Sequence, residues 1–107
     1  MHHPLVVNKH KSEYDVYIGR KKNCATHYGN PFSHHWYPGV SVVVGSVEEA
    51  VQCFEDWLDG KAWETIEPMR REWILRHIPD LENMRLGCFG CEPVCHGDIL
   101  ARRANKD

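Results

Sequence analysis

The chain has 107 residues, of which 42% are hydrophobic and 26% are charged, and its formal net charge is −2. These values are typical of one soluble globular domain, and they exclude a bulk basic field for nucleic-acid binding. Apolar runs fall short of the roughly 20 residues that span a bilayer, and no apolar signal-peptide stretch opens the chain. We therefore expect a single domain, residues 1–107, without a membrane partner and located in a reducing cytoplasm. In a reducing compartment, we expect the five cysteines to be free thiols or metal ligands rather than disulfide partners.

The first half of the chain predicts short strands separated by polar segments. Residues 5–7 and 14–18 are β-branched or aromatic runs, and residues 40–44 form a third apolar run that is either a strand or a lead-in to a helix. Residues 21–38 form a long loop, and loops of this length are uncommon in a compact domain unless they serve a function.

Two helices follow. Ser46 and Glu49 form a capping box at the start of the first helix, and Gly60 is placed to end it. The second helix is predicted over Pro68–His77, since proline is tolerated in the first turn and Pro79 would stop the helix. Its buried stripe is expected to consist of Met69, Trp73 and Ile74.

The chain then predicts a buried strand over residues 85–89, a loop over 90–97 and a final helix over 98–104. We expect a small α/β domain with a Rossmann-like sheet of three to four strands and flanking helices. The strands lie near Val6, Val16 and Leu86, and also near Val42 if residues 40–44 form a strand. The cysteine/histidine loop should lie at the carboxyl edge of the last strand, where open α/β sheets bind ligands.

That loop concentrates thiol and imidazole groups, and one interpretation is a metal site. Cys88 and Cys91 have the spacing of half a zinc knuckle, and Cys95 and His96 would complete a Cys3His set. Adjacent residues seldom point at one ion, so an external ligand is an alternative. The candidates are Cys24, His27, His34 and His35.

The other interpretation is an active site. Cys88 ends a strand, and Cys95 and His96 precede a helix whose dipole stabilises a thiolate or an anion. His96 is a candidate general acid/base. Asp98 would either orient His96 or, as the more common role, cap the helix. Small buried hydrophobic cysteines explain Cys53 well but explain the cluster poorly.

A second set of candidates lies in the first half of the chain. Arg20 follows a strand and is placed to bind phosphate or carboxylate. Asn30 is a ligand contact or, equally, a turn former. Phe32, Trp36 and Tyr37 are candidates for stacking on a base, although aromatic residues in small proteins more often belong to the core.

The ordered motifs of the chain resemble the DUF4326 family, small proteins of bacteria and their phages without an established activity. The resemblance spans residues 5–104 and rests on five segments: Val6-Val7-Asn8, Tyr17-Ile18-Gly19-Arg20, Gly29-Asn30-Pro31-Phe32, Trp57-Leu58, and Leu86-Gly87-Cys88 through Cys95-His96-Gly97-Asp98. A fainter similarity to DUF488 proteins supports an α/β fold with the site at the sheet edge.

The family pattern places its second cysteine where this chain has Gly90, so Cys91 lies one position later. The interval from Cys88 to Cys95 is kept, which favours Cys88, Cys95 and His96 as the fixed core of the site.

We therefore expect the Arg20 and Cys88–His96 segments to converge on one face. The best-fitting function is that of a small, phage-like protein that processes or binds a nucleotide, another anionic ligand or a nucleic-acid component. The alternative is a zinc-stabilised, non-catalytic module that binds a protein of the bacterial host. Whether the chain is an enzyme stays open.

Overall fold

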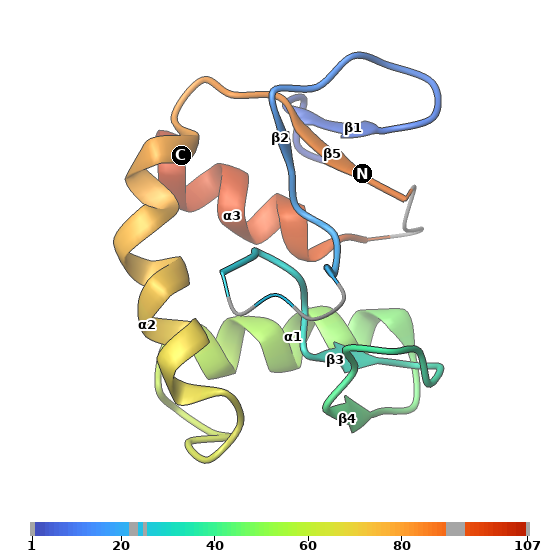
Figure 1. Cartoon of the computed structure of the whole chain (residues 1–107), viewed down its shortest axis with the longest axis vertical. Helices are drawn as coiled ribbons and strands as arrows, with labels where there is room; N and C mark the ends of the chain where they lie inside the picture. The colour runs from blue at the N-terminus through green and yellow to red at the C-terminus, as the bar shows by residue number, and fades with distance from the viewer. Residues whose placement is uncertain (1, 22–23, 25, 90–93, 107) are drawn as a thin grey trace.

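The computed structural model describes residues 2–21, 24, 26–89 and 94–106. Its larger sheet has three parallel strands in the order β1-β5-β2, formed by Val6–Asn8, Leu86–Cys88 and Val16–Tyr17. β5 is the central strand and is wholly buried (Figure 1). The chain is thus an α/β protein in which the last strand lies between the two strands that come first in the sequence.

A second, smaller sheet pairs β3 (Phe32–Ser33) with β4 (Val42–Val43), also in parallel. In the described part of the chain Val42 pairs with Phe32 of β3, so the expectation that it would join the main sheet is wrong. β3 falls inside the segment that the sequence predicted as loop. Its partner is a strand only ten positions later, held by the Ser41, Val42 and Val44 amides donating to carbonyls of Pro31 and Ser33.

The helices are α1 (Val47–Leu58), α2 (Pro68–His77) and α3 (His96–Asn105), with a 3-10 turn, η1 (Ile78–Leu81), following α2. Ser46 caps α1 by accepting the Glu49 amide at 3.0 Å, and the Glu49 carboxylate reaches back to the amide of Gly45 at 3.5 Å. The Ser46 cap agrees with the prediction, whereas Glu49 contacts the amide of the residue before the cap and not that of Ser46, so only half of the predicted capping box is formed. No helix in the described ranges is both long and apolar enough to cross a bilayer.

Two helix predictions need correction. Met69 is 83% exposed, because the helix turns it outward, whereas Ile74 is fully buried. The final helix begins at His96, two residues earlier than predicted, and its N-cap is Cys95 rather than Asp98.

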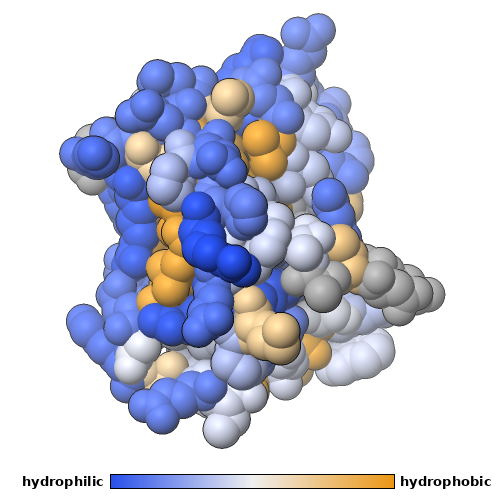
Figure 2. Space-filling model, turned by 60° about the vertical axis from the view of Figure 1, so that its left-hand side comes forward, coloured by the Kyte–Doolittle hydropathy of each residue, from blue (hydrophilic) through white to orange (hydrophobic). Residues whose placement is uncertain are grey.

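The core lies between the main sheet and the helices. α3 packs against β1, β5 and η1, and α1 packs against β3, α2 and α3 (Figure 1). Fully buried side chains in it include Ile18, Phe32, Phe54, Trp57 and Leu100. On the face shown in Figure 2, hydrophilic residues predominate and apolar residues form small separate patches.

Close approach explains one glycine of β5. A Cβ on Gly87 would stand 2.6 Å from the ring of Tyr14, which packs directly over the strand. Glycine at this position therefore lets Tyr14 cover the middle of β5, and the chain runs from the carboxyl ends of β5 and β2 into the site.

Candidate functional site

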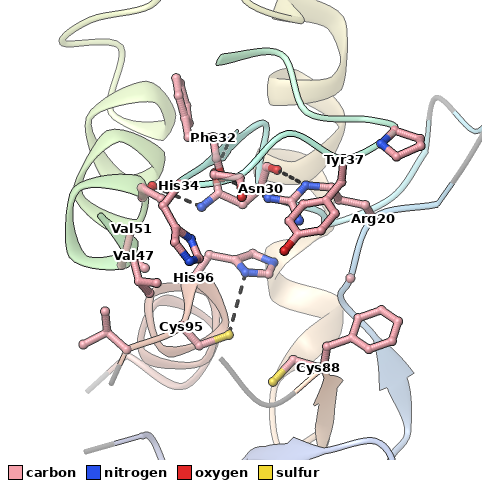
Figure 3. Close-up of a pocket in the computed structure, with 16 residues that line it drawn as sticks. Arg20, Asn30, Phe32, His34, Tyr37, Val47, Val51, Cys88, Cys95 and His96 are labelled. Carbon is pink, nitrogen blue, oxygen red and sulfur yellow. Dashed lines mark hydrogen bonds between the residues drawn. The ribbon is translucent and has the colours of Figure 1, made fainter. Parts of the chain in front are cut away.

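A pocket of about 670 Å³ opens where the chain leaves β2 and β5 and enters α3. Its other walls come from α1 and from the segment that joins β3 to β4 (Figure 3). Its volume is within the range of small-molecule sites. The described lining residues are Gly19, Arg20, Asn30, Phe32, Ser33, His34, Tyr37, Pro38, Val47, Ala50, Val51, Cys88, Phe89, Val94, Cys95 and His96.

The pocket contains most of the side chains that the sequence singled out. Arg20, Asn30 and Phe32 lie on one side, and Cys88, Cys95 and His96 on the other. The two distant segments do meet at one pocket. Asp98 is not among its lining residues, and Cys91 lies outside the described residues.

Cys95 and His96 form a pair at the N-terminus of α3. The Cys95 Sγ lies 3.7 Å from the His96 Nδ1 and accepts the Gly97 amide at 3.3 Å. On the far side of the ring, His96 Nε2 lies 2.8 Å from the carbonyl oxygen of Ile18. Because a carbonyl oxygen only accepts, Nε2 is assigned the proton, and neutral His96 presents an unprotonated Nδ1 to the Cys95 thiol.

The environment keeps that imidazole neutral. His96 is buried against the ring of Phe54, and this burial lowers its pKa to about 4. The positive charge of Arg20 lowers the pKa further, while the bond to Ile18 opposes the shift. At neutral pH His96 is therefore unprotonated, and the lowered pKa also makes it a weaker base than an ordinary histidine.

Arg20 is fixed by the turn that precedes β3. Its Nε donates to the Asn30 carbonyl at 2.8 Å, and one Nη donates to the Phe32 carbonyl at 2.9 Å. A Cβ on Gly29 would stand 2.8 Å from the Cα of Arg20, so glycine is required for this approach. The guanidinium thus lies on the pocket wall in a set position (Figure 3).

Asn30 and Phe32 serve the local structure. The Asn30 Oδ1 accepts the Phe32 amide at 3.0 Å, and its Nδ2 donates to the Ala50 carbonyl at 3.1 Å. This is the turn-forming role. The ring of Phe32 is fully buried and packs against Trp57 and Trp63 at centroid distances of 6.3 and 5.1 Å, so its faces are occupied by the core.

The Asp98 carboxylate bonds to groups other than the His96 ring that it was expected to orient. Its carboxylate accepts the Cys95 amide at 3.1 Å and the His3 amide at 2.8 Å, and it contacts the His2 ring at 3.1 Å. It completes the capping box of α3 and ties the start of the chain to this helix. The described contacts give Asp98 a structural role.

The metal interpretation finds no arrangement to support it in the described ranges. There, His, Cys, Asp and Glu side chains form no group of three or more that could hold an ion. Of the external candidates, His34 lines the pocket. His27 is buried elsewhere, and its Nδ1 accepts the Gly29 amide at 3.1 Å. Zinc binding through Cys88, Cys91, Cys95 and His96 stays a prediction.

Several pocket residues were missed by sequence reasoning. Val47 and Val51 supply an apolar wall of the pocket. Ile18 does not line the pocket, but its carbonyl oxygen holds the His96 ring. A backbone carbonyl leaves no trace in residue type, whereas the α1 wall was foreseeable from the apolar face of that helix. Tyr37 and His34 point into the same space as His96 (Figure 3).

The fold and the pocket define a small α/β protein with a thiol and an imidazole facing an arginine. The chain belongs to the DUF4326 family, described as a domain of unknown function, whose model matches residues 6–106. A protein of Enterobacteria phage T4, described as an uncharacterized 12.4 kDa protein in the nrdA-td intergenic region, is 37% identical over 103 residues. The match covers 94% of this chain and 77% of the phage protein. No solved structure matches the chain.

Proposed function

We propose that the pocket binds a small anionic ligand of the nucleotide class and that Cys95, with His96 as its base, is the reactive group that faces it. The observation that carries this proposal is that Arg20 and the Cys95–His96 pair line one pocket. The site lies at the carboxyl edge of a parallel sheet, which is the ligand-binding edge of Rossmann-like folds.

Charge favours an anion. The chain as a whole carries more acidic than basic residues, yet the described lining contains the cationic side chain of Arg20 and no carboxylate. An anionic group in this pocket would meet a fixed guanidinium and the N-terminal end of α3 without a repelling charge from the described lining.

Shape and polarity favour a ligand that also has a flat apolar part. Val47, Ala50 and Val51 form one wall of the pocket, and the ring of Tyr37 forms part of another. Nucleotides combine a phosphate with a planar base, so one ligand would use both kinds of wall.

The chemistry assigned to Cys95 follows the logic of a nucleophile, a base and a group that orients the base. The thiol proton would move to His96 Nδ1, and the Ile18 carbonyl would hold the ring through Nε2. The charge of Arg20 opposes a lasting imidazolium, so the pair rests as thiol and neutral imidazole and transfers the proton only during reaction. Cys88 is the second thiol within the pocket.

The direct test is titration calorimetry with the four ribonucleoside monophosphates and their nucleosides. We expect binding of at least one nucleotide with a Kd below about 1 mM, and at least tenfold weaker binding of its nucleoside because the Arg20 contact is lost. This comparison uses unchanged protein, so folding cannot confuse it. Equal affinity for nucleotide and nucleoside, or no binding at about 1 mM, would refute the proposal.

The role of Cys95 is tested by thiol alkylation followed by peptide mapping. Both thiols are buried, with 0% of Cys95 and 9% of Cys53 exposed, so iodoacetamide should label both slowly. A bound nucleotide should slow the labelling of Cys95 much more than the labelling of Cys53. Cys53 is the matched control because it is buried in α1 outside the pocket lining.

A further inference from the structure

Aromatic side chains are unusually exposed around the mouth of the pocket. Tyr37 and Phe89 both line it and are 47% and 61% exposed, and Trp36, next to Tyr37 in the chain, is 70% exposed. Exposed aromatic groups gathered at one place mark a binding surface more often than scattered ones do. These rings therefore form a second feature of the site, outside the thiol and imidazole chemistry.

The ring of Phe89, which follows β5, lies near one cationic side chain and one histidine. The ammonium of Lys9 lies 4.2 Å from the ring centre of Phe89 and 4.8 Å from that of Tyr17. The His10 ring lies 5.6 Å from Phe89. The Lys9 amide donates to the Cys88 carbonyl at 2.8 Å, which places this group beside the end of β5.

The β3–β4 connection carries a similar group. The rings of His34 and His35 are tilted to one another by 43° with their centres 4.1 Å apart, and His35 meets Tyr37 edge to face at 6.2 Å. The two groups thus come from separate elements, and each supplies one of the exposed rings that line the pocket.

We infer that the physiological ligand is a single-stranded nucleic acid, with one nucleotide in the pocket and its neighbours stacked on Phe89 and on Tyr37 and Trp36. The inference rests on the proposed function and narrows its ligand. A free nucleotide has one base, so at least two of the exposed rings at the mouth would have no base stacked on them. A strand carries several bases and phosphates, which would use the exposed rings together with the ammonium of Lys9 beside Phe89.

The test compares a labelled single strand of about ten nucleotides, a length within the roughly 4–16 nucleotides that one OB-fold covers, with mononucleotides by anisotropy competition. DNA and RNA strands of one sequence are run in parallel, together with a duplex. We expect at least one single strand to bind at least tenfold more tightly than any mononucleotide, to bind more tightly than the duplex, and to weaken as salt rises.

Variants locate the strand. Phe89→Ala and Trp36→Ala should each weaken strand binding by about 5- to 100-fold, the range for loss of one stacked base. Trp36→Ala should leave mononucleotide affinity unchanged, because Trp36 does not line the pocket. Met69→Ala removes an apolar side chain that is 83% exposed on α2 and should change neither affinity.

The outcomes separate the two proposals. Mononucleotides that bind as tightly as the strand, or strand binding that both aromatic variants leave unchanged, would overturn the nucleic-acid inference and leave the nucleotide pocket intact. Absence of both mononucleotide and strand binding would overturn the pocket function itself. Tighter binding of duplex than of single strand would overturn the inference as well, since stacking on exposed rings requires unpaired bases.

Discussion

His96 predicts a loss of stability on mild acidification. Its pKa is lowered from 6.5 to about 4 in the folded protein, first by burial and then by the charge of Arg20. The unfolded chain would bind a proton at an ordinary histidine pKa. Between these two values the unfolded state therefore binds more protons than the folded state, and stability must rise with pH.

The magnitude follows from the size of the shift. At 1.36 kcal/mol per pKa unit, a depression from 6.5 to about 4 corresponds to about 3 kcal/mol. This contribution is fully present above pH 6.5 and is lost as the pH falls through about 4. It would remove a large share of the roughly 5–15 kcal/mol that stabilises a typical domain.

Urea denaturation of the wild-type protein and His96→Gln at pH values from about 4 to 7.5 measures the effect. Glutamine keeps a donor for the Ile18 carbonyl but does not titrate, so the difference in unfolding free energy should shrink by about 3 kcal/mol toward low pH. Carboxylates common to both proteins cancel in this difference. Parallel pH profiles would refute the assignment of a buried neutral imidazole.

NMR titration of the His96 ring in wild-type protein gives an independent check that does not depend on the variant. A midpoint near pH 4 is expected, and a midpoint near 6.5 would contradict the burial argument. His27 offers a second case, because burial and the charge of Arg70 lower its pKa to about 4 as well. His27→Gln should therefore remove a further part of the rise in unfolding free energy between about pH 4 and 6.5.

Three further predictions concern the scaffold and the metal. Gly87→Ala should destabilise the fold by about 1–3 kcal/mol in urea denaturation, because its Cβ would meet Tyr14, whereas Gly45→Ala should change stability by less than about 0.5 kcal/mol. Arg70→Ala should cost about 3–5 kcal/mol, since this buried arginine bonds to a carboxylate and two backbone carbonyls; exposed Arg85→Ala should cost much less. If Cys88, Cys91, Cys95 and His96 hold a structural zinc, chelators should lower the melting temperature, and a stoichiometric zinc whose removal unfolds the chain would establish the zinc-module alternative; an unchanged melting temperature would refute it.

The helices were predictable because capping residues and prolines near their ends mark where they begin and stop. α2 has the predicted bounds, Pro68–His77, since proline fits its first turn and Pro79 turns the chain into η1. The exposed position of Met69 was not predictable in the same way. A methionine fits an apolar stripe in any amphipathic pattern, and only the packing of α2 against its neighbours decides which face is covered.

The strands could be located from the local sequence, but not all of their pairings could. β1, β2 and β5 were found from their β-branched or apolar runs, but the pairing of β4 with β3 was not. β3 is a strand of two residues, Phe32–Ser33, too short to show an alternating pattern. Its position depends on hydrogen bonds from residues 41–44 and on the carbonyl that accepts from Arg20.

The site was predictable in its members but only partly in their roles. Cys95 was expected either as a ligand or as a nucleophile, and in the structure it also caps α3, a position that the sequence rules give to serine, threonine, asparagine or aspartate. Because a thiol is a weaker cap than a hydroxyl or carboxylate, a cysteine at this position is not explained by helix stability alone. Asp98, three residues later, supplies the carboxylate that closes the capping box. The helix start thus keeps its stability while a thiol is held 3.7 Å from the unprotonated nitrogen of His96, and the proposed reactive role of Cys95 rests on this arrangement.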